Sequence, residues 1–348
     1  MKNRAILYSL LVLLLIAGCG QTKSDSTVTV TPTTTAPAIT STLEVPLETS
    51  DVPISPDNAT DVKRLRTVDE GLGRIWTMAF SSDGKYFAYT NQNGLNVQDA
   101  ANNEPVFTFS ILEPNTFNSF AFSLDGTLLA SPQTIWDVQS HEVLDTLDGS
   151  GYLHPVFSPD GAWLAVSGVQ PIKIWDVASG QLARTFESLP DNTSFSISFS
   201  PDGTLLADSG RDGRITLWDV ASGKSVRSLP HGTHNDVHDI QFSADGKLLV
   251  SVGTDYAVRL WEVSSGQVLQ TMMHGNGLYG VAFSPDGKLV ASAGCDRTVK
   301  LWDVASGRMV KSLGHGDEVT SVAFSTDGAL LASATYEEKI YFWSIPSD

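Results

Sequence analysis

Short apolar runs alternate with turn-forming residues from residue 61 to residue 348. In one stretch the apolar runs cover 278–283, 289–293, 298–302 and 309–313. Runs of this length bounded by Gly, Pro, Asp and Ser are typical of β-strands. We find no convincing helical period in the same region. The pattern therefore predicts units of four short strands joined by tight turns.

The sequence Phe-Ser-x-Asp-Gly marks these units, and it occurs seven times. The phenylalanines are separated by 42, 35, 42, 43, 41 and 41 residues. Asp can bond to its own backbone and Gly can adopt positive φ, so each copy predicts a turn between the first two strands of a unit. A period near 40 indicates a repeat architecture. The copies begin at Phe80, Phe122, Phe157, Phe199, Phe242, Phe283 and Phe324.

A second landmark, Trp-Asp or a variant of it, follows six of the seven phenylalanines. The pairs are Trp136-Asp137, Trp175-Asp176, Trp218-Asp219, Trp261-Glu262, Trp302-Asp303 and Trp343-Ser344. With Gly314-His315 before the last copy, the pattern resembles the WD40 family of β-propellers. The resemblance covers about 285 of the 348 residues. It implies an all-β fold, a seven-bladed β-propeller of four-stranded antiparallel blades.

The first and last copies predict how the ring closes. The chain stops five residues after Trp343, before a fourth strand can form. Residues 62–67 are similar to the fourth strands of other copies, such as 310–313, so we expect this N-terminal strand to complete the last blade and remove an open edge. The second copy is shorter, because only 131–134 separate its second and third strands.

The N-terminus has the pattern of a targeting segment. Lys2 and Arg4 precede an apolar run over 5–17, which is too short to span a membrane. Residues 15–19 end in Cys19 and resemble the lipobox of bacterial lipoproteins, which implies cleavage before Cys19 and attachment of lipid to it. The alternative is an ordinary secretory signal that is cleaved nearby, with Cys19 incidental.

Three regions follow from these patterns. Residues 1–18 are predicted as a lipoprotein signal peptide and 61–348 as the propeller. Residues 19–60 are predicted as a lipidated Cys and a disordered tether, because they are rich in Thr and Pro and contain no aromatic residue. We expect a lipid-anchored protein at the cell membrane or cell envelope, on the extracytoplasmic side.

Charge and cysteine content narrow the possible partners. The net charge of −17 argues against a nucleic-acid-binding surface, which needs basic patches. Apart from Cys19, the chain has one cysteine, Cys295, so the propeller has no internal disulfide. We expect a monomeric propeller that is stabilised by its core.

The resemblance also implies hydrogen-bonded networks of His, Ser, Asp and Trp that fix individual blades. A hydrolase triad is the alternative interpretation of such residues. The fourth copy has Asp208 and Asp212 but no histidine, and the seventh has Glu337 for the acid. The fifth copy has its histidine displaced to His234 or His231. The network residues are His274, Ser292, Asp296, Trp302, His315, Ser333, Trp343, Ser251, Asp255 and Trp261.

One histidine cluster raises the question of a metal. His231, His234 and His238 are closely spaced, with Asp236 and Asp239 beside them. They lack the closed Cys and His spacing of a structural zinc site. We therefore expect no metal and no cofactor, and a zinc or nickel site is the alternative interpretation.

These observations favour a protein-interaction scaffold of the cell envelope that is not an enzyme. Binding is expected on the face that carries the loops between blades and the turns between second and third strands, where Tyr and Arg are common contact residues. An envelope enzyme or ligand sensor that uses the central channel is the alternative. The candidate partner-binding residues are Arg211, His231, His234, Tyr256, Asn276, Tyr279, Arg297 and Tyr336.

Overall fold

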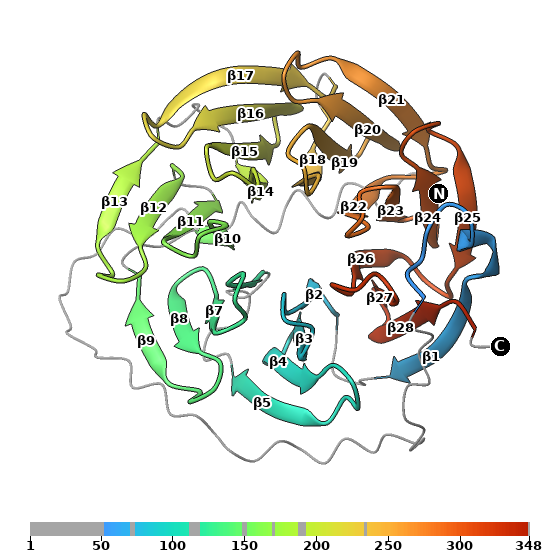
Figure 1. Ribbon diagram of the computed structural model, residues 1–348, viewed down its shortest axis with the longest axis horizontal. Coiled ribbons are helices and arrows are strands. Elements are labelled where there is room, and N and C mark those ends of the chain that lie inside the picture. The colour runs from blue at the N-terminus through green and yellow to red at the C-terminus, as the bar shows by residue number, and fades with distance from the viewer. Residues whose placement is uncertain are drawn as a thin grey trace, which may run out of the picture. The chain divides into compact units, whose positions relative to one another are not determined.

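The computed structural model describes residues 52–69, 74–110, 119–147, 152–168, 171–186, 193–232 and 235–346, which all belong to one compact unit. These residues form seven four-stranded antiparallel sheets, arranged as blades in a ring (Figure 1). The predicted seven-bladed β-propeller is confirmed. Within a blade we name the strands a to d from the axis outward.

The strand bounds follow the sequence repeat closely. Blade 1 contains β2 (Met78–Phe80), β3 (Tyr86–Asn91), β4 (Gly94–Asp99) and β5 (Pro105–Ser110), and blade 2 contains β6 (Ala121–Phe122), β7 (Leu128–Ala130), β8 (Thr134–Asp137) and β9 (Val143–Thr146). Blade 3 contains β10 (Tyr152–Phe157), β11 (Trp163–Gly168), β12 (Lys173–Asp176) and β13 (Leu182–Thr185), and blade 4 contains β14 (Ser194–Phe199), β15 (Leu205–Gly210), β16 (Arg214–Asp219) and β17 (Lys224–Pro230). Blade 5 contains β18 (Val237–Phe242), β19 (Leu248–Gly253), β20 (Ala257–Glu262) and β21 (Val268–Met273), and blade 6 contains β22 (Leu278–Phe283), β23 (Leu289–Gly294), β24 (Thr298–Asp303) and β25 (Met309–Gly314). Blade 7 contains β26 (Val319–Phe324), β27 (Leu331–Thr335), β28 (Lys339–Ser344) and β1 (Lys63–Asp69).

Alternating strand direction divides the connections between two faces of the ring. The turns between strands b and c and the connections from d to the next a share one face, which we call the b–c face. The a–b and c–d turns lie on the opposite face, which we call the a–b face. The seven Phe-Ser-x-Asp-Gly sequences all form a–b turns, as predicted.

Each a–b turn is held by the same side-chain bonds. The Ser Oγ donates to the Asp Oδ1 over 2.5 to 2.7 Å in all seven copies. In blade 4 the backbone N–H of Leu205 donates to Ser200 Oγ over 2.9 Å, and Gly203 has a φ of 70°. The repeat motif is therefore a structural turn, with its polar groups used locally.

The core lies between neighbouring blades, because strand b is buried on both faces. Strand β23 is buried along its whole length, whereas the outer strand β17 is exposed at six of seven positions. One cluster joins Ala207 and Leu217 of blade 4 to Phe242 and Trp261 of blade 5. The Trp of one blade thus packs against the preceding blade, so the blades stabilise one another.

The ring closes as the sequence predicts. Strand β1 pairs antiparallel with β28, the last strand of the chain. The guanidinium of Arg66 lies 4.5 Å from the ring centroid of Phe342 on that strand. The short second copy also forms a complete blade, with only three residues between β7 and β8.

The folded region begins earlier than the predicted boundary at residue 61. The 3₁₀-helix η1 (Ala59–Asp61) and the residues before it are ordered from position 52. Ile54 is 1% exposed in the core of blades 6 and 7, and its N–H donates to Gly328 O over 2.9 Å. An apolar residue buried in this way belongs to the propeller, so the folded region begins before residue 61. Residues 1–51, including Cys19, lie outside the described residues.

Candidate functional site

The network of blade 6 connects four side chains in series. Trp302 Nε1 donates to Ser292 Oγ over 2.7 Å, and His274 Nε2 lies 2.7 Å from the same oxygen. His274 Nδ1 lies 3.0 Å from Asp296 Oδ2. A neutral imidazole with its proton on Nδ1 satisfies both contacts, because Nε2 can then accept the Ser292 hydroxyl proton.

The electrostatics of this network favour a neutral histidine and an ionised acid. Burial lowers the pKa of His274 to about 4, although Asp296 opposes the shift. Burial also opposes ionisation of Asp296, but hydrogen bonds from Thr298 and Gly275 lower its pKa to about 2. The network is therefore fully formed at neutral pH.

Blade 5 has the same network with the imidazole turned over. His231 Nδ1 lies 2.8 Å from Ser251 Oγ and Nε2 lies 3.1 Å from Asp255 Oδ1. Trp261 Nε1 donates to Ser251 over 2.7 Å. His231 stands two residues further from its serine than His274 does, so its ring comes from a longer loop. Of the two candidate histidines, His231 occupies the network, and His234 lies outside the described residues.

Blade 7 keeps three of the four groups. His315 Nε2 lies 2.7 Å from Ser333 Oγ, and Trp343 Nε1 donates to the same oxygen over 2.8 Å. His315 Nδ1 lies 3.0 Å from the carbonyl oxygen of Leu313, so its proton goes to the backbone and not to Glu337. Burial lowers the pKa of His315 to about 4.

The three serines are not placed to act as nucleophiles. Ser251, Ser292 and Ser333 are each 0% exposed, and each accepts a hydrogen bond from a tryptophan. A nucleophile must reach a substrate carbonyl, which a buried hydroxyl between two partners cannot do. The networks therefore fix the blades, and their Ser-His-Asp content carries no catalysis.

Blade 4 breaks the pattern at the position of the network serine. Asp208 stands there, nine residues after Phe199, and it is 7% exposed. Burial raises its pKa to about 7, with Asp212 adding to the shift. A hydrogen bond from Ser194 opposes this shift, whereas Trp218 Nε1 is buried without a hydrogen-bond partner in the described part of the chain. Unpaired buried polar groups are costly, so this blade is less well satisfied than blades 5 to 7.

Most candidate partner-binding residues do lie on the b–c face. Arg211, Tyr256, Arg297 and Tyr336 occupy b–c turns, and Asn276 lies in the connection between blades 5 and 6; all five are exposed. The two tyrosines are 44% and 38% exposed, respectively.

Two candidates are located elsewhere. His231 is 2% exposed and is used in the blade 5 network, so its prediction as a surface contact was wrong. Tyr279 is half-buried at the central channel, where its ring stacks on that of His238 with centroids 5.6 Å apart.

The channel gathers aromatic side chains that the sequence analysis missed. A cavity of about 160 Å³ at the axis is lined by Trp76, His154, Phe195, His238 and Tyr279, among others. Phe195 lies edge-on to His238, with centroids 5.5 Å apart. In blades 4, 5 and 6 the pairing register shifts at this point, which marks a β-bulge that can re-aim a side chain. The sequence does contain a signal for this cluster, because an aromatic residue or histidine stands four residues before the repeat phenylalanine in these blades.

The carboxylate of Asp239, which lies at the channel, forms hydrogen bonds to both neighbouring blades. Asp239 Oδ1 accepts from Ser196 Oγ in blade 4, and Oδ2 accepts from Val281 N–H in blade 6, both over 2.9 Å. Burial raises the pKa of Asp239 to about 6. His238 Nδ1 lies 2.8 Å from the carbonyl oxygen of Leu278. His231, His238 and Asp239 therefore serve separate structural contacts, and among the described residues no three His, Cys, Asp or Glu side chains group as a metal site would.

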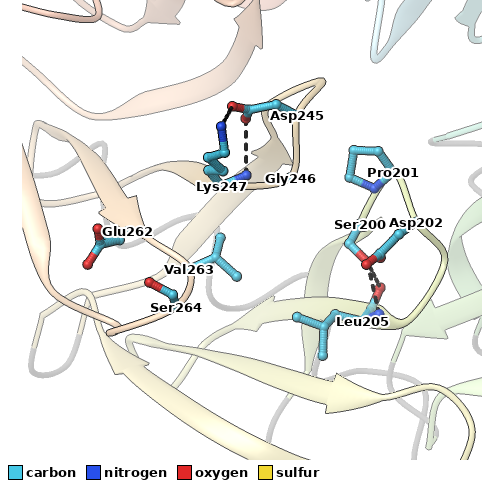
Figure 2. A pocket seen from close by; sticks show the side chains of 10 residues that line it. All are labelled: Ser200, Pro201, Asp202, Leu205, Asp245, Gly246, Lys247, Glu262, Val263 and Ser264. Carbon is cyan, nitrogen blue, oxygen red and sulfur yellow. Dashed lines mark hydrogen bonds and ion pairs between the residues drawn. The ribbon is translucent and has the colours of Figure 1, made fainter.

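A wider groove lies on the a–b face between blades 4 and 5 (Figure 2). Its walls are two neighbouring a–b turns and the c–d turn after Glu262. The carboxylate of Asp202 is bonded by Ser200, and that of Asp245 is paired with Lys247 at 3.2 Å. Every repeat supplies the Ser-Asp pair, and a lysine also follows the turn at Lys85 and Lys288, so the groove has no chemistry that is special to this position.

Comparison with known proteins adds a family resemblance for part of the ring. The family "WD domain, G-beta repeat" matches residues 181–219, 223–262, 266–303 and 307–344, less than half of the chain. Each match covers strand d of one blade and strands a to c of the next, so these four segments are WD40 repeats. Two rice proteins (Oryza sativa subsp. japonica) are similar in sequence. Small ribosomal subunit protein RACK1y is 32% identical over 112 residues, and RACK1z is 31% identical over 110 residues. The match spans 28% of this chain and about a third of the length of each relative.

Proposed function

We propose that this chain is a lipid-anchored scaffold that binds protein partners at the cell envelope through its b–c face. The main support for this proposal is the contrast between the two faces of the ring. The a–b face repeats one turn seven times, whereas the b–c turns carry Arg211, Tyr256, Arg297 and Tyr336. Loops that vary on a constant frame are where binding residues concentrate.

The repeats support this reading and argue against catalysis. Propellers with WD40 repeats are typical of interaction scaffolds, and the serines of the Ser-His-Asp sets here are buried in blade cores. The two rice relatives are named as proteins of the small ribosomal subunit. The net charge of −17 argues against an RNA contact for this chain, so a protein partner is the better proposal.

The partner surface can be tested by crosslinking in intact cells. We expect Tyr256→Ala combined with Tyr336→Ala to abolish recovery of the partner, because aromatic side chains provide large contact areas. The melting temperature should stay the same, since both side chains are more than a third exposed. Leu124→Ala is the matched control, because Leu124 is 61% exposed on the a–b face. Loss of the partner with the control, or retention with the double variant, would count against this face.

The anchor makes a separate prediction. Cys19 ends the segment that resembles a lipobox, and a thiolate is readily alkylated. Radiolabelled fatty acid should enter the wild-type protein and not Cys19→Ala, which should leave the membrane fraction. Equal labelling of both proteins would refute lipidation at this residue.

A second function is favoured by the aromatic channel. The side chains of Trp76, Phe195 and Tyr279 line the axial cavity and provide aromatic faces on which a small ligand can stack. A small molecule that raises the melting temperature of the wild type, but not of Tyr279→Ala, would support a ligand sensor.

A further inference from the structure

The b–c turns of blades 5, 6 and 7 contain residues in an unfavourable backbone conformation. Fourteen residues after the repeat phenylalanine, Tyr256, Arg297 and Glu338 have φ values of 69°, 64° and 71°. Gly213 holds the same position in blade 4 with a φ of 74°. A residue with a Cβ atom is strained in this left-handed region, whereas glycine is not.

The fold requires this conformation but does not require these side chains. In blade 5 the carbonyl oxygen of Tyr256 accepts from His274 N–H over 2.9 Å. In blade 6 the carbonyl oxygen of Arg297 accepts from His315 N–H over 2.9 Å. Gly213 makes the corresponding bond with His231 N–H over 3.0 Å. Since only backbone atoms are involved, glycine would satisfy these turns in blades 5 and 6 as it does in blade 4.

Among the described residues, no polar or ring contact of these three side chains offsets the strain. Tyr256 is 44% exposed, Arg297 is exposed and Glu338 is half-buried. Across the residues that the structure describes, none of the three side chains makes a hydrogen bond, ion pair or ring contact. The guanidinium of Arg297 makes no ion pair among the described residues, although the chain contains 39 acidic residues.

On the a–b face, positive-φ positions carry residue types that adopt this conformation readily. Every a–b turn has glycine at its positive-φ position. The described c–d turns have glycine in four blades, and Asn103 and His141 in two others. Asn and His are among the residue types that adopt this conformation more readily. Tyr, Arg and Glu at such a position are therefore confined to the b–c face.

We propose that Tyr256, Arg297 and Glu338 form a docking strip for a protein partner. The partner segment presents an apolar or aromatic side chain to Tyr256, an acidic one to Arg297 and a basic one to Glu338. Blades 5, 6 and 7 are consecutive in the ring (Figure 1), so one extended segment can follow the strip. Backbone strain kept without internal benefit is a feature of binding sites. The strip rests on the proposed scaffold function and specifies its partner.

The first arm of the test measures stability. Tyr256→Gly, Arg297→Gly and Glu338→Gly should each leave the melting temperature unchanged or raise it by up to about 2 °C, because strain is relieved. Gly213→Ala is the control and should lower it, because a Cβ there would lie 1.9 Å from Gly232 O. If the glycine variants melt several degrees lower, the side chains serve the fold and the strip is overturned.

The second arm measures recognition with a defined probe, a library of phage-displayed random peptides of roughly 12 residues selected on the full chain. Enriched peptides should combine an acidic and an apolar residue, and they should bind Arg297→Gly about tenfold more weakly. Arg297→Glu should select basic peptides instead. Absence of enrichment, or equal binding to Arg297→Glu, overturns the strip.

The two proposals fail in different ways. Suppose that a partner is crosslinked in cells from positions outside the strip, and that the three glycine variants recover it as well as the wild type does. The scaffold function then stands, and the strip is overturned. If crosslinkers on neither face capture a partner, the scaffold function itself fails.

Discussion

At the residue scale, the residue at one repeat position stabilises some blades and destabilises another. The hydroxyl of Ser292 joins a tryptophan donor to a neutral histidine, and Ser251 and Ser333 do the same. Asp208 replaces this serine in blade 4, where burial raises its pKa to about 7. A folded-state pKa above the ordinary value near 3.9 means that stability falls as pH rises from about 4 to 7.

Asp208→Ser should therefore stabilise the protein, and more so at high pH. The substitution removes a buried carboxyl and offers Trp218 Nε1 the acceptor that it lacks. We expect a gain on the order of 2–4 kcal/mol at pH 7.5 and a smaller gain at pH 5, measured by urea unfolding. The low pKa values of His274 and His315 reduce stability as pH falls from about 6.5 to 4, but they do so in both proteins. Asp212→Asn is the control, with a smaller gain, and equal gains for Asp208→Ser at both pH values would contradict the assignment.

At the element scale, burial depends on distance from the axis. Strand b is enclosed between two blades, and small residues such as Ala207 and Ala291 let neighbouring sheets approach closely. The outer strands contribute fewer buried side chains. The N-terminal segment departs from this rule, since residues 54–62 insert apolar side chains into the core of blades 6 and 7.

This segment can be tested with a single substitution. Ile54→Ala should lower the free energy of unfolding by about 2–4 kcal/mol, because the side chain is 1% exposed and leaves a cavity. Val52 is 50% exposed, so Val52→Ala should change stability by less than about 0.5 kcal/mol. Indistinguishable unfolding curves for the two variants would show that the segment is not part of the propeller.

At the scale of the whole molecule, the ring is stabilised by closure. Strand β1 pairs with β28 along its length, and clusters of core residues join each blade to the next. An unpaired outer edge in blade 7 would expose backbone groups and uncover the aromatic rings beneath β1. The blades should consequently unfold together.

Deleting residues 61–69 should lower the melting temperature of the entire propeller in one cooperative transition. Thermal unfolding followed by circular dichroism measures this directly. A synthetic peptide of the deleted residues, added in excess, should partly restore the melting temperature by binding only the folded state. The closure would be unimportant if the truncated protein melted like the full chain.

The repeat, the strand order, the a–b turns and the closing strand can be predicted from the amino-acid sequence alone, because these depend on local turn chemistry and a fixed period. The sequence also identified the serines and tryptophans of the networks. The folded structure was needed to show that His231 joins Ser251, that Asp208 is buried, and that Tyr279 faces the channel. Each of these depends on loop path, β-bulges and packing between blades, which exist only in the assembled ring. The strain at Tyr256 likewise became visible only through the backbone bond that holds its turn.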